Sequence, residues 1–223
     1  QTADTLTLND SKGRSIRFAP LAPGQAAYSR SENLWIVRGG LDRLDLNKEL
    51  PVSRLNLAWM GLHESDRRNP ALFFVTNNLL GPWWVLGTTA PADQRLKRSA
   101  EGHVVAVQDG VGRQYRLELK TTLAGLATEA SGGWGDDCGV RLMAVYLTHD
   151  PHEPDLPHHP LVRYEYSPRG ELIAVYGRGG NRNRAFQYHP QLLGRMVAHA
   201  YEGRPPVLYV YNEAGKVVEQ QRQ

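Results

Sequence analysis

Tyr164-Glu-Tyr166-Ser-Pro-Arg-Gly170-Glu-Leu172 is the stretch of sequence that decides the fold, because its pattern recurs twice further along the chain. The later copies occupy residues 186–196 and 209–217, so the aromatic pairs start 22 and then 23 residues apart. Two aromatic residues at i and i+2 lie on the same face of a β-strand. Each pair is followed by a turn, a glycine and an apolar stretch, which predicts one β-hairpin per repeat.

The repeated positions are the candidate structural residues of the chain. They are the three aromatic pairs and the glycine after each pair: Tyr164, Tyr166, Gly170, Phe186, Tyr188, Gly194, Tyr209, Tyr211 and Gly215. A single hairpin of this kind cannot bury its own faces, so it needs neighbours on either side. We therefore predict an all-β fold in which antiparallel hairpins form an extended sheet.

The hairpin turns are predicted from the offset between a polar residue and a glycine. A type I turn favours Asp, Asn or Ser at its first position and a residue with positive φ at its end. An offset of three links four such pairs: Asp10/Gly13, Asp109/Gly112, Ser167/Gly170 and Asn212/Gly215. The middle repeat needs a wider turn, since Tyr188 stands six rather than four residues before Gly194. Only glycine takes positive φ without steric cost, so Gly→Ala at 170 or 215 should cost roughly 1 kcal/mol or more.

Composition agrees with a β-rich chain. The 22 glycines and 14 prolines are spread along all 223 residues, which disfavours a helical bundle and favours many short strands. The net charge is only +3 and basic residues are scattered among acids, so no nucleic-acid-binding stripe is indicated. No apolar run reaches the roughly 18 residues that a membrane span requires. The first residues lack the design of a signal peptide, so we expect a fragment whose export signal lies elsewhere.

Three apolar and aromatic stretches in the middle of the chain are also predicted to be strands. They are rich in the residue types that strands favour. These stretches are Leu55-Asn-Leu-Ala-Trp59, Leu72-Phe-Phe-Val75 and Pro82-Trp83-Trp84-Val85.

The repeats resemble the YD repeats of Rhs (rearrangement hot spot) proteins, in which Tyr-x-Tyr-(Asp)-x-x-x-Gly-Arg-Leu units recur many times. The resemblance is specific over residues 161–223, and it departs from the signature at Ser167, His189 and Asn212 in place of Asp and at Glu171 and Lys216 in place of Arg. Residues 1–130 resemble, less specifically, the β-rich region that precedes such repeats. We expect residues 131–160 to be a Gly/Pro/His-rich connection and the repeats to continue beyond the sequence.

The resemblance implies both a shape and a role. Rhs proteins wind their repeats into a hollow, curved β-sheet shell that encloses a C-terminal toxin domain, and this chain would be a non-catalytic segment of the wall. Such bacterial polymorphic toxins are secreted or delivered to other cells in bacterial competition, commonly by type VI secretion. The implied partners are the remaining repeats, the enclosed toxin domain and proteins of the secretion apparatus. No enzyme activity and no cofactor are implied.

A histidine-rich segment at residues 149–160 is the candidate metal site. It offers four ligand side chains of the right type: His149, His152, His158 and His159. Prolines at 151, 154, 157 and 160 exclude a helix that would place two histidines on one face. An exposed connection between strands is therefore favoured over a metal site.

Other candidate sites are weaker. Cys138 lies beside two acids that disfavour its thiolate, and residues 131–137 lack the Lys and Ser/Thr of a phosphate-binding loop. The alternative function is an extracellular carbohydrate- or cell-surface-binding module in which Trp83 and Trp84 stack on sugar rings. A hydrolase ranks third, since no carboxylate pair is singled out. An unpaired edge on the last hairpin predicts edge-to-edge association or disorder after about residue 205.

Overall fold

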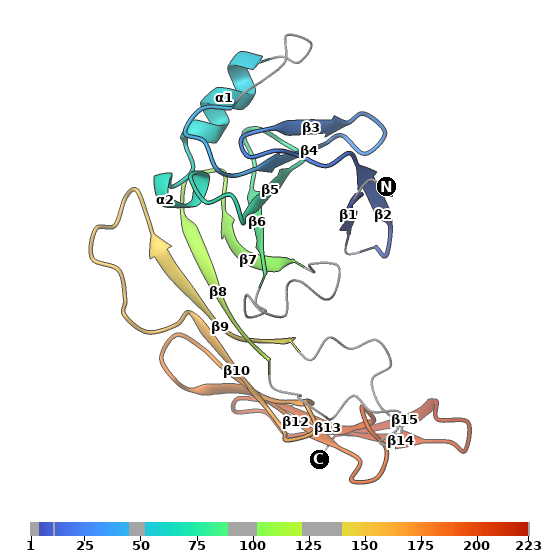
Figure 1. The fold of residues 1–223 in the computed structure, drawn as a ribbon. Coiled ribbons are helices and arrows are strands. Elements are labelled where there is room, and N and C mark those ends of the chain that lie inside the picture. Colours follow the sequence, from blue (N-terminus) through green and yellow to red (C-terminus); the bar gives the residue numbers. More distant parts are fainter. Residues whose placement is uncertain (1–4, 11, 45–51, 89–101, 122–139, 223) are drawn as a thin grey trace. The chain divides into compact units, whose positions relative to one another are not determined.

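The computed structural model describes residues 5–10, 12–44, 52–88, 102–121 and 140–222. Within these residues, thirteen strands form one antiparallel sheet whose spatial order follows the chain from β3 to β15, and β1 and β2 form a separate hairpin (Figure 1). Each strand therefore pairs with its neighbours in sequence. The prediction of an all-β fold built from antiparallel hairpins is confirmed.

Two compact units divide the chain. The first comprises Gln1–Tyr115 with Thr148–Pro154, and the second comprises Arg116–Leu147 with Asp155–Gln223. The three-part division expected from the sequence stays a prediction, and residues 122–139 within it lie outside the described part of the chain.

The first unit holds most of the buried side chains. Its elements are β1 Leu6–Asn9, β2 Ser15–Phe18, β3 Ala26–Ser29, β4 Leu34–Arg38, α1 Val52–Met60, α2 Glu64–Arg67, β5 Phe73–Thr76, β6 Trp83–Gly87, β7 His103–Gln108 and the start of β8 Gln114–Thr121. One face of the sheet packs with α1 around Val37, Phe74 and Val85. The opposite face packs with the β1–β2 hairpin around Ile36 and Val75.

The strand predicted over Leu55–Trp59 is wrong, because these residues form the middle of helix α1. Leu55 and Trp59 are both fully buried, whereas Leu57 between them is 77% exposed. A strand would place all three on one face, whereas a helix places i and i+4 together and i+2 opposite. Trp59 then packs edge-on against Phe74, with ring centroids 4.7 Å apart.

The other two apolar stretches are strands as predicted, β5 and β6. Neither α1 nor α2, the two helices of the described residues, is long and apolar enough to cross a membrane.

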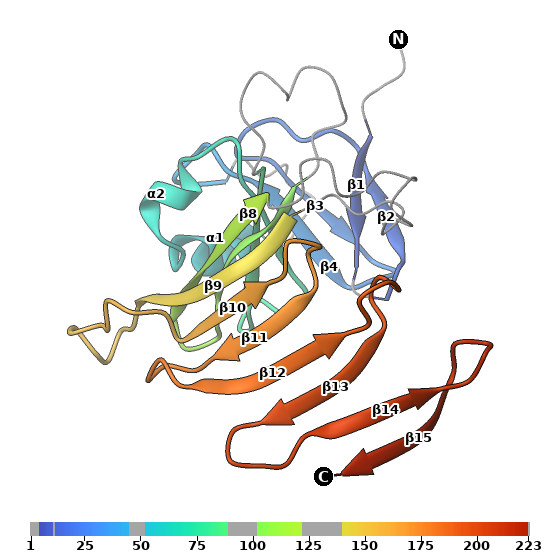
Figure 2. The same cartoon turned by 90° about the horizontal axis from the view of Figure 1, so that it is seen from below.

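The second unit is a single layer of strands (Figure 2). Its strands are the rest of β8, β9 Val140–His149 as far as Leu147, β10 Val162–Tyr166, β11 Leu172–Tyr176, β12 Arg182–Tyr188, β13 Met196–Tyr201, β14 Val207–Tyr211 and β15 Val217–Arg222. The three repeats are the hairpins β10–β11, β12–β13 and β14–β15. Apart from glycine, the buried side chains of its described residues are Ala144, Glu171, Ala174 and Ala198. The layer therefore leaves both of its faces partly exposed.

Candidate functional site

The turns that begin with Asp10 and Asp109 share one set of hydrogen bonds. Asp10 Oδ1 accepts the N–H groups of Lys12 and Arg14, both at 2.9 Å, and Oδ2 accepts Arg14 Nε at 2.8 Å. Asp109 Oδ1 accepts the N–H groups of Val111 and Arg113 at 3.0 and 2.9 Å, and Oδ2 accepts Arg113 Nε at 2.7 Å. In each turn, one aspartate carboxylate therefore accepts hydrogen bonds from two backbone N–H groups and from the arginine side chain.

Electrostatics favours the charged form of both carboxylates. The pKa of Asp10 lies below its usual value because the backbone N–H and the guanidinium of Arg14 bind the carboxylate. For Asp109, partial burial opposes ionisation, but the hydrogen bonds from Arg113 outweigh it and lower the pKa. These turns should therefore weaken when the carboxylates are protonated at low pH.

The repeat turns use other side chains in the same place. Ser167 Oγ accepts the N–H of Arg169 at 3.2 Å, and Asn212 Oδ1 accepts the N–H of Lys216 at 2.9 Å. In the wider middle turn, His189 Nδ1 accepts the N–H groups of Gln191 and Leu192 at 3.1 Å. Three different residue types thus substitute for the Asp of the repeat signature.

All five glycines that the sequence places at the ends of hairpin turns have positive φ. The angles are 75° at Gly13, 89° at Gly112, 77° at Gly170, 73° at Gly194 and 74° at Gly215. A side chain at such an angle is strained. In the four shorter turns the glycine N–H also donates to the carbonyl three residues earlier, at 2.9–3.2 Å.

The second aromatic of two repeats ties its hairpin to the preceding one. Tyr166 donates its hydroxyl to the Leu142 carbonyl at 2.8 Å, and Tyr211 donates to the Met196 carbonyl at 2.5 Å. Burial raises the pKa of Tyr166, and burial together with the nearby Glu171 carboxylate raises that of Tyr188. Burial thus favours the neutral hydroxyl of Tyr166, which is the form that donates to the Leu142 carbonyl.

The first aromatic of each repeat lies two residues before the second one, on the same face of the sheet. Tyr164 is paired with Val175, Phe186 with His199, and Tyr209 with Gln220. The Tyr209 hydroxyl is 2.8 Å from His199 Nδ1, so this aromatic also contacts the neighbouring hairpin.

We give the name junction residues to four side chains at one repeated position: Arg141, Glu171, Arg195 and Lys216. The first three make a second set of contacts between hairpins. Each precedes an apolar residue near the start of a strand. Arg141 Nε donates to the Gly170 carbonyl at 3.1 Å, and Glu171 Oε1 accepts the Gly194 N–H at 2.9 Å. The Arg195 guanidinium carbon lies 5.1 Å from the ring centre of Tyr211. Each of these three thus reaches the turn end of the next hairpin.

A β-bulge in every repeat is a feature that the sequence reasoning missed. The register shifts between Glu165 and Tyr166, between Gln187 and Tyr188, and between Val210 and Tyr211. Each shift leaves one extra residue in the returning strand beside the second aromatic. The bulge occurs at the same position of all three repeats, so an alignment of the repeats is the signal that could have indicated it.

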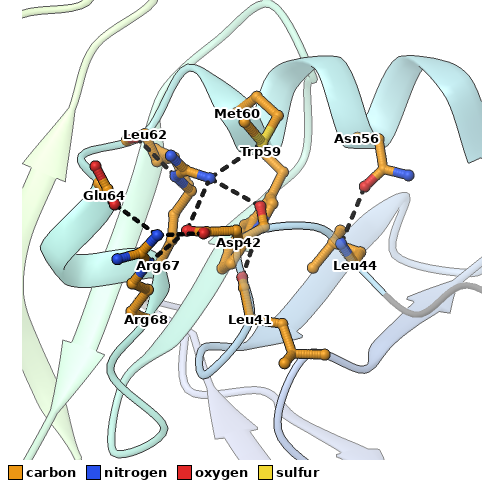
Figure 3. Close-up of polar contacts among 10 residues, drawn as sticks. All are labelled: Leu41, Asp42, Leu44, Asn56, Trp59, Met60, Leu62, Glu64, Arg67 and Arg68. Atoms are coloured by element: carbon orange, nitrogen blue, oxygen red, sulfur yellow. Dashed lines mark hydrogen bonds and ion pairs between the residues drawn. The ribbon is translucent and has the colours of Figure 1, made fainter.

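The first unit contains a polar cluster centred on a buried arginine (Figure 3). Arg67 is 6% exposed, and its guanidinium donates to the carbonyls of Leu62 and Asp42 at 3.0 and 2.8 Å. Arg68 donates from Nε to the Asp42 carboxylate at 2.8 Å, which lowers the pKa of Asp42. These contacts fasten the segment after α1 to the loop after β4.

The four candidate histidines are all exposed. His149 ends β9, His152 lies in the turn that follows, and His158 and His159 belong to the second unit. Among the residues that the structure describes, no three or more His, Cys, Asp and Glu side chains gather into a group that could hold a metal ion. The structure therefore adds no support to the metal site.

Of the two tryptophans proposed to stack on sugars, Trp83 is buried and Trp84 is partly buried. Trp83 is 2% exposed and packs near Trp59, with ring centroids 6.3 Å apart, and Trp84 packs against the smaller core cluster. Tyr201 is the only aromatic among the exposed large apolar side chains of the described residues. Cys138 and residues 131–137 lie outside the described residues.

Comparison with known proteins finds a similar toxin. The chain is 34% identical over 236 aligned positions, 97% of its length, to "Toxin protein Tse5" of Pseudomonas aeruginosa. The chain spans 17% of the length of that relative. No protein-family model matches it.

Solved structures of TcdB2-TccC3 and TcdB2-TccC3-Cdc42 resemble the chain weakly, at 14% and 13% identity and TM-scores of 0.40 and 0.39. They cover 88% and 98% of the chain, which in turn covers 8% and 11% of them. The repeated aromatic pairs and turn glycines, together with the identity along nearly its whole length to a curated toxin, show that the chain belongs to the Rhs, or YD-repeat, family.

Proposed function

We propose that the chain is a non-catalytic segment of the wall of an Rhs toxin, a wall that encloses a C-terminal toxin domain for delivery to other cells. The observation that carries the proposal is the construction of the second unit. Its hairpins lie side by side in a single layer, and hydroxyl and junction-residue contacts link each hairpin to its neighbour. Such a layer separates two spaces and can be lengthened one hairpin at a time.

The two partly exposed faces of the second unit suit this role. A compact domain buries one face of each sheet in a core, whereas a wall needs one face for the solvent and one for the contents. The partners would be the remaining repeats and the enclosed toxin domain. Type VI secretion and a role in bacterial competition belong to the same proposal, since the name of the similar protein identifies it only as a toxin.

No specific observation favours the carbohydrate-binding alternative. Sugar stacking requires exposed aromatic rings, and the two tryptophans proposed for it are packed in the first unit.

Limited proteolysis of the full-length parent protein tests the proposal. Its C-terminal domain should survive a protease dose that digests the same domain expressed alone. Gly215→Val introduces a β-branched residue at φ 74° and should open the wall, making the C-terminal domain digestible. Gly179→Val, at a glycine without positive φ in an exposed turn, is the matched control and should preserve protection. Equal digestion of the domain within the unaltered parent and alone would refute enclosure.

A further inference from the structure

Two departures from the repeat signature meet at a single junction. The first is the acidic junction residue Glu171, which replaces the Arg of the signature, and the second is the wide turn that ends at Gly194. In the structure, Glu171 Oε1 accepts the Gly194 N–H at 2.9 Å, and the Glu171 residue is only 4% exposed. The geometry of the turns explains why these two departures occur together.

The four-residue turns use the N–H of their own glycine. Gly170 donates to the Ser167 carbonyl and Gly215 donates to the Asn212 carbonyl, both at 2.9 Å. The Gly170 carbonyl is the group that bonds to the preceding hairpin, where it accepts a hydrogen bond from Arg141 Nε. A four-residue turn therefore calls for a donor in the hairpin before it.

Arg195 stands in the same position towards Gly215. Its guanidinium lies 2.9 Å from the point where a Cβ of residue 215 would be. A cationic donor thus lies beside the glycine of both repeats that have a four-residue turn.

In the wide middle turn, the glycine N–H makes no hydrogen bond within the turn itself. The turn closes instead through Arg195 N–H to the Leu192 carbonyl at 3.2 Å, and the described residues of this turn provide no backbone acceptor for Gly194. The preceding hairpin can supply an acceptor for this N–H, but an arginine side chain has none. Glu171 supplies it, while Arg169 donates to the carbonyls of His189 and Pro190 at 3.2 and 2.8 Å.

We propose that the junction residue selects the turn of the hairpin that can lie next to it. A basic junction residue takes a neighbour with a four-residue turn, and an acidic one takes a neighbour with the wide turn. This rule goes beyond the proposed function, because it concerns which hairpins can be neighbours and holds whatever the sheet encloses.

The rule also assigns a partner to the open edge of the sheet. Within the described residues, β15 pairs with β14 alone, and its Val217 and Val218 are 44% and 61% exposed. Lys216 is the junction residue at this edge and is basic. The edge therefore fits a hairpin of the same repeat type with a four-residue turn, its glycine carbonyl facing Lys216 and its second aromatic donating to the Val217 carbonyl. Continuity with the two preceding junctions carries this assignment.

A double-mutant cycle tests the rule on the 223-residue chain. Deleting Gln191 and Leu192 brings Gly194 to four residues after Tyr188, the spacing of the first repeat. Glu171→Arg and the deletion should each lower the urea midpoint, and the combined variant should recover at least half of the summed loss. Glu213→Arg, a charge reversal at an exposed turn position, should show no such coupling to the deletion. Additive losses in the combined variant would overturn the rule.

Amide exchange gives a readout that general destabilisation does not mimic. Glu171→Ala should speed exchange of the Gly194 amide by about tenfold or more, while Glu171→Gln, which keeps an acceptor oxygen, should leave it within a few fold. The Gly170 amide, which bonds within its own turn, is the internal reference and should not change. Equal acceleration of the two amides in Glu171→Ala would contradict a specific acceptor role.

The open edge is tested by extending the chain after residue 223 with a copy of either residues 202–222, whose turn has four residues, or residues 177–201, whose turn is wide. The first extension should slow exchange of the β15 amides, and Lys216→Glu should reverse the preference in favour of the second. Equal protection by the two extensions would overturn the assignment. So would protection of β15 in the unextended chain through pairing with a second copy, detected by light scattering.

Discussion

Replacing Leu55 and Leu57 by alanine, one at a time, measures the consequence of residues 52–60 being a helix. Leu55 is fully buried in the main core cluster, whereas Leu57 is 77% exposed. Removing a buried leucine side chain costs about 2.7–5 kcal/mol, because the transfer free energy is lost and a cavity remains. An exposed leucine in a helix should change the free energy of unfolding by no more than about 0.5 kcal/mol.

Urea denaturation followed by tryptophan fluorescence is a suitable assay, because Trp35, Trp59 and Trp83 all belong to this core cluster. With a slope of about 1–3 kcal/mol per molar urea, Leu55→Ala should lower the midpoint by about 1–2 M or more. Leu57→Ala should leave the midpoint almost unchanged.

The pair also discriminates between two secondary structures. In a strand, residues 55, 57 and 59 would share a face, so both leucines would lose similar burial. A loss for Leu57→Ala as large as that for Leu55→Ala would refute the helix and the packing of Trp59 beneath it.

Three further measurements examine the turns and the histidines. Gly215→Ala should destabilise the last hairpin by roughly 1 kcal/mol or more because φ is 74°. Gly179→Ala, at a glycine without positive φ, should be neutral or slightly stabilising. Amide hydrogen exchange of the hairpin next to each substitution measures both effects, and faster exchange in both variants or in neither would contradict this. Since its folded pKa is lowered, Asp109 contributes stability above its unfolded pKa of about 4 that is lost as pH falls through the folded value. Asp109→Asn should therefore lose less stability than the parent between pH 7 and pH 3, and an equal loss would count against the turn carboxylate. Calorimetric titration with Zn²⁺ or Ni²⁺ should show no micromolar binding to the four exposed histidines, and saturable binding would revive the metal site.

The repeat hairpins could be read from the sequence because their information is local. An aromatic pair two residues apart defines one face of a strand, and the turn length follows from the distance to a glycine. The hairpins β10–β11, β12–β13 and β14–β15 lie where these patterns occur. The edge-to-edge association predicted for the last hairpin stays a prediction, and it is the rival of the repeat hairpin assigned to that edge above. Residues 207–211 and 217–222 are described as paired strands, in contrast to the predicted alternative of disorder.

Helix α1 could not be read in this way, because five residues with apolar content suit a strand or a buried helix equally well. The decision came from residues distant in sequence: Phe74 and Trp83 provide the surface on which Trp59 packs. The exposure of Leu57 then follows from that docking.

The contacts between hairpins show the same division. Sequence alone determined the repeat, the turn positions, and the fact that Glu171 and the wide turn both depart from the signature. Only the tertiary structure revealed that the two departures touch, because residues 171 and 194 become neighbours when separate hairpins pair side by side. A hydrogen bond between them depends on which backbone group each turn leaves unused, and that is decided by the folded turns themselves.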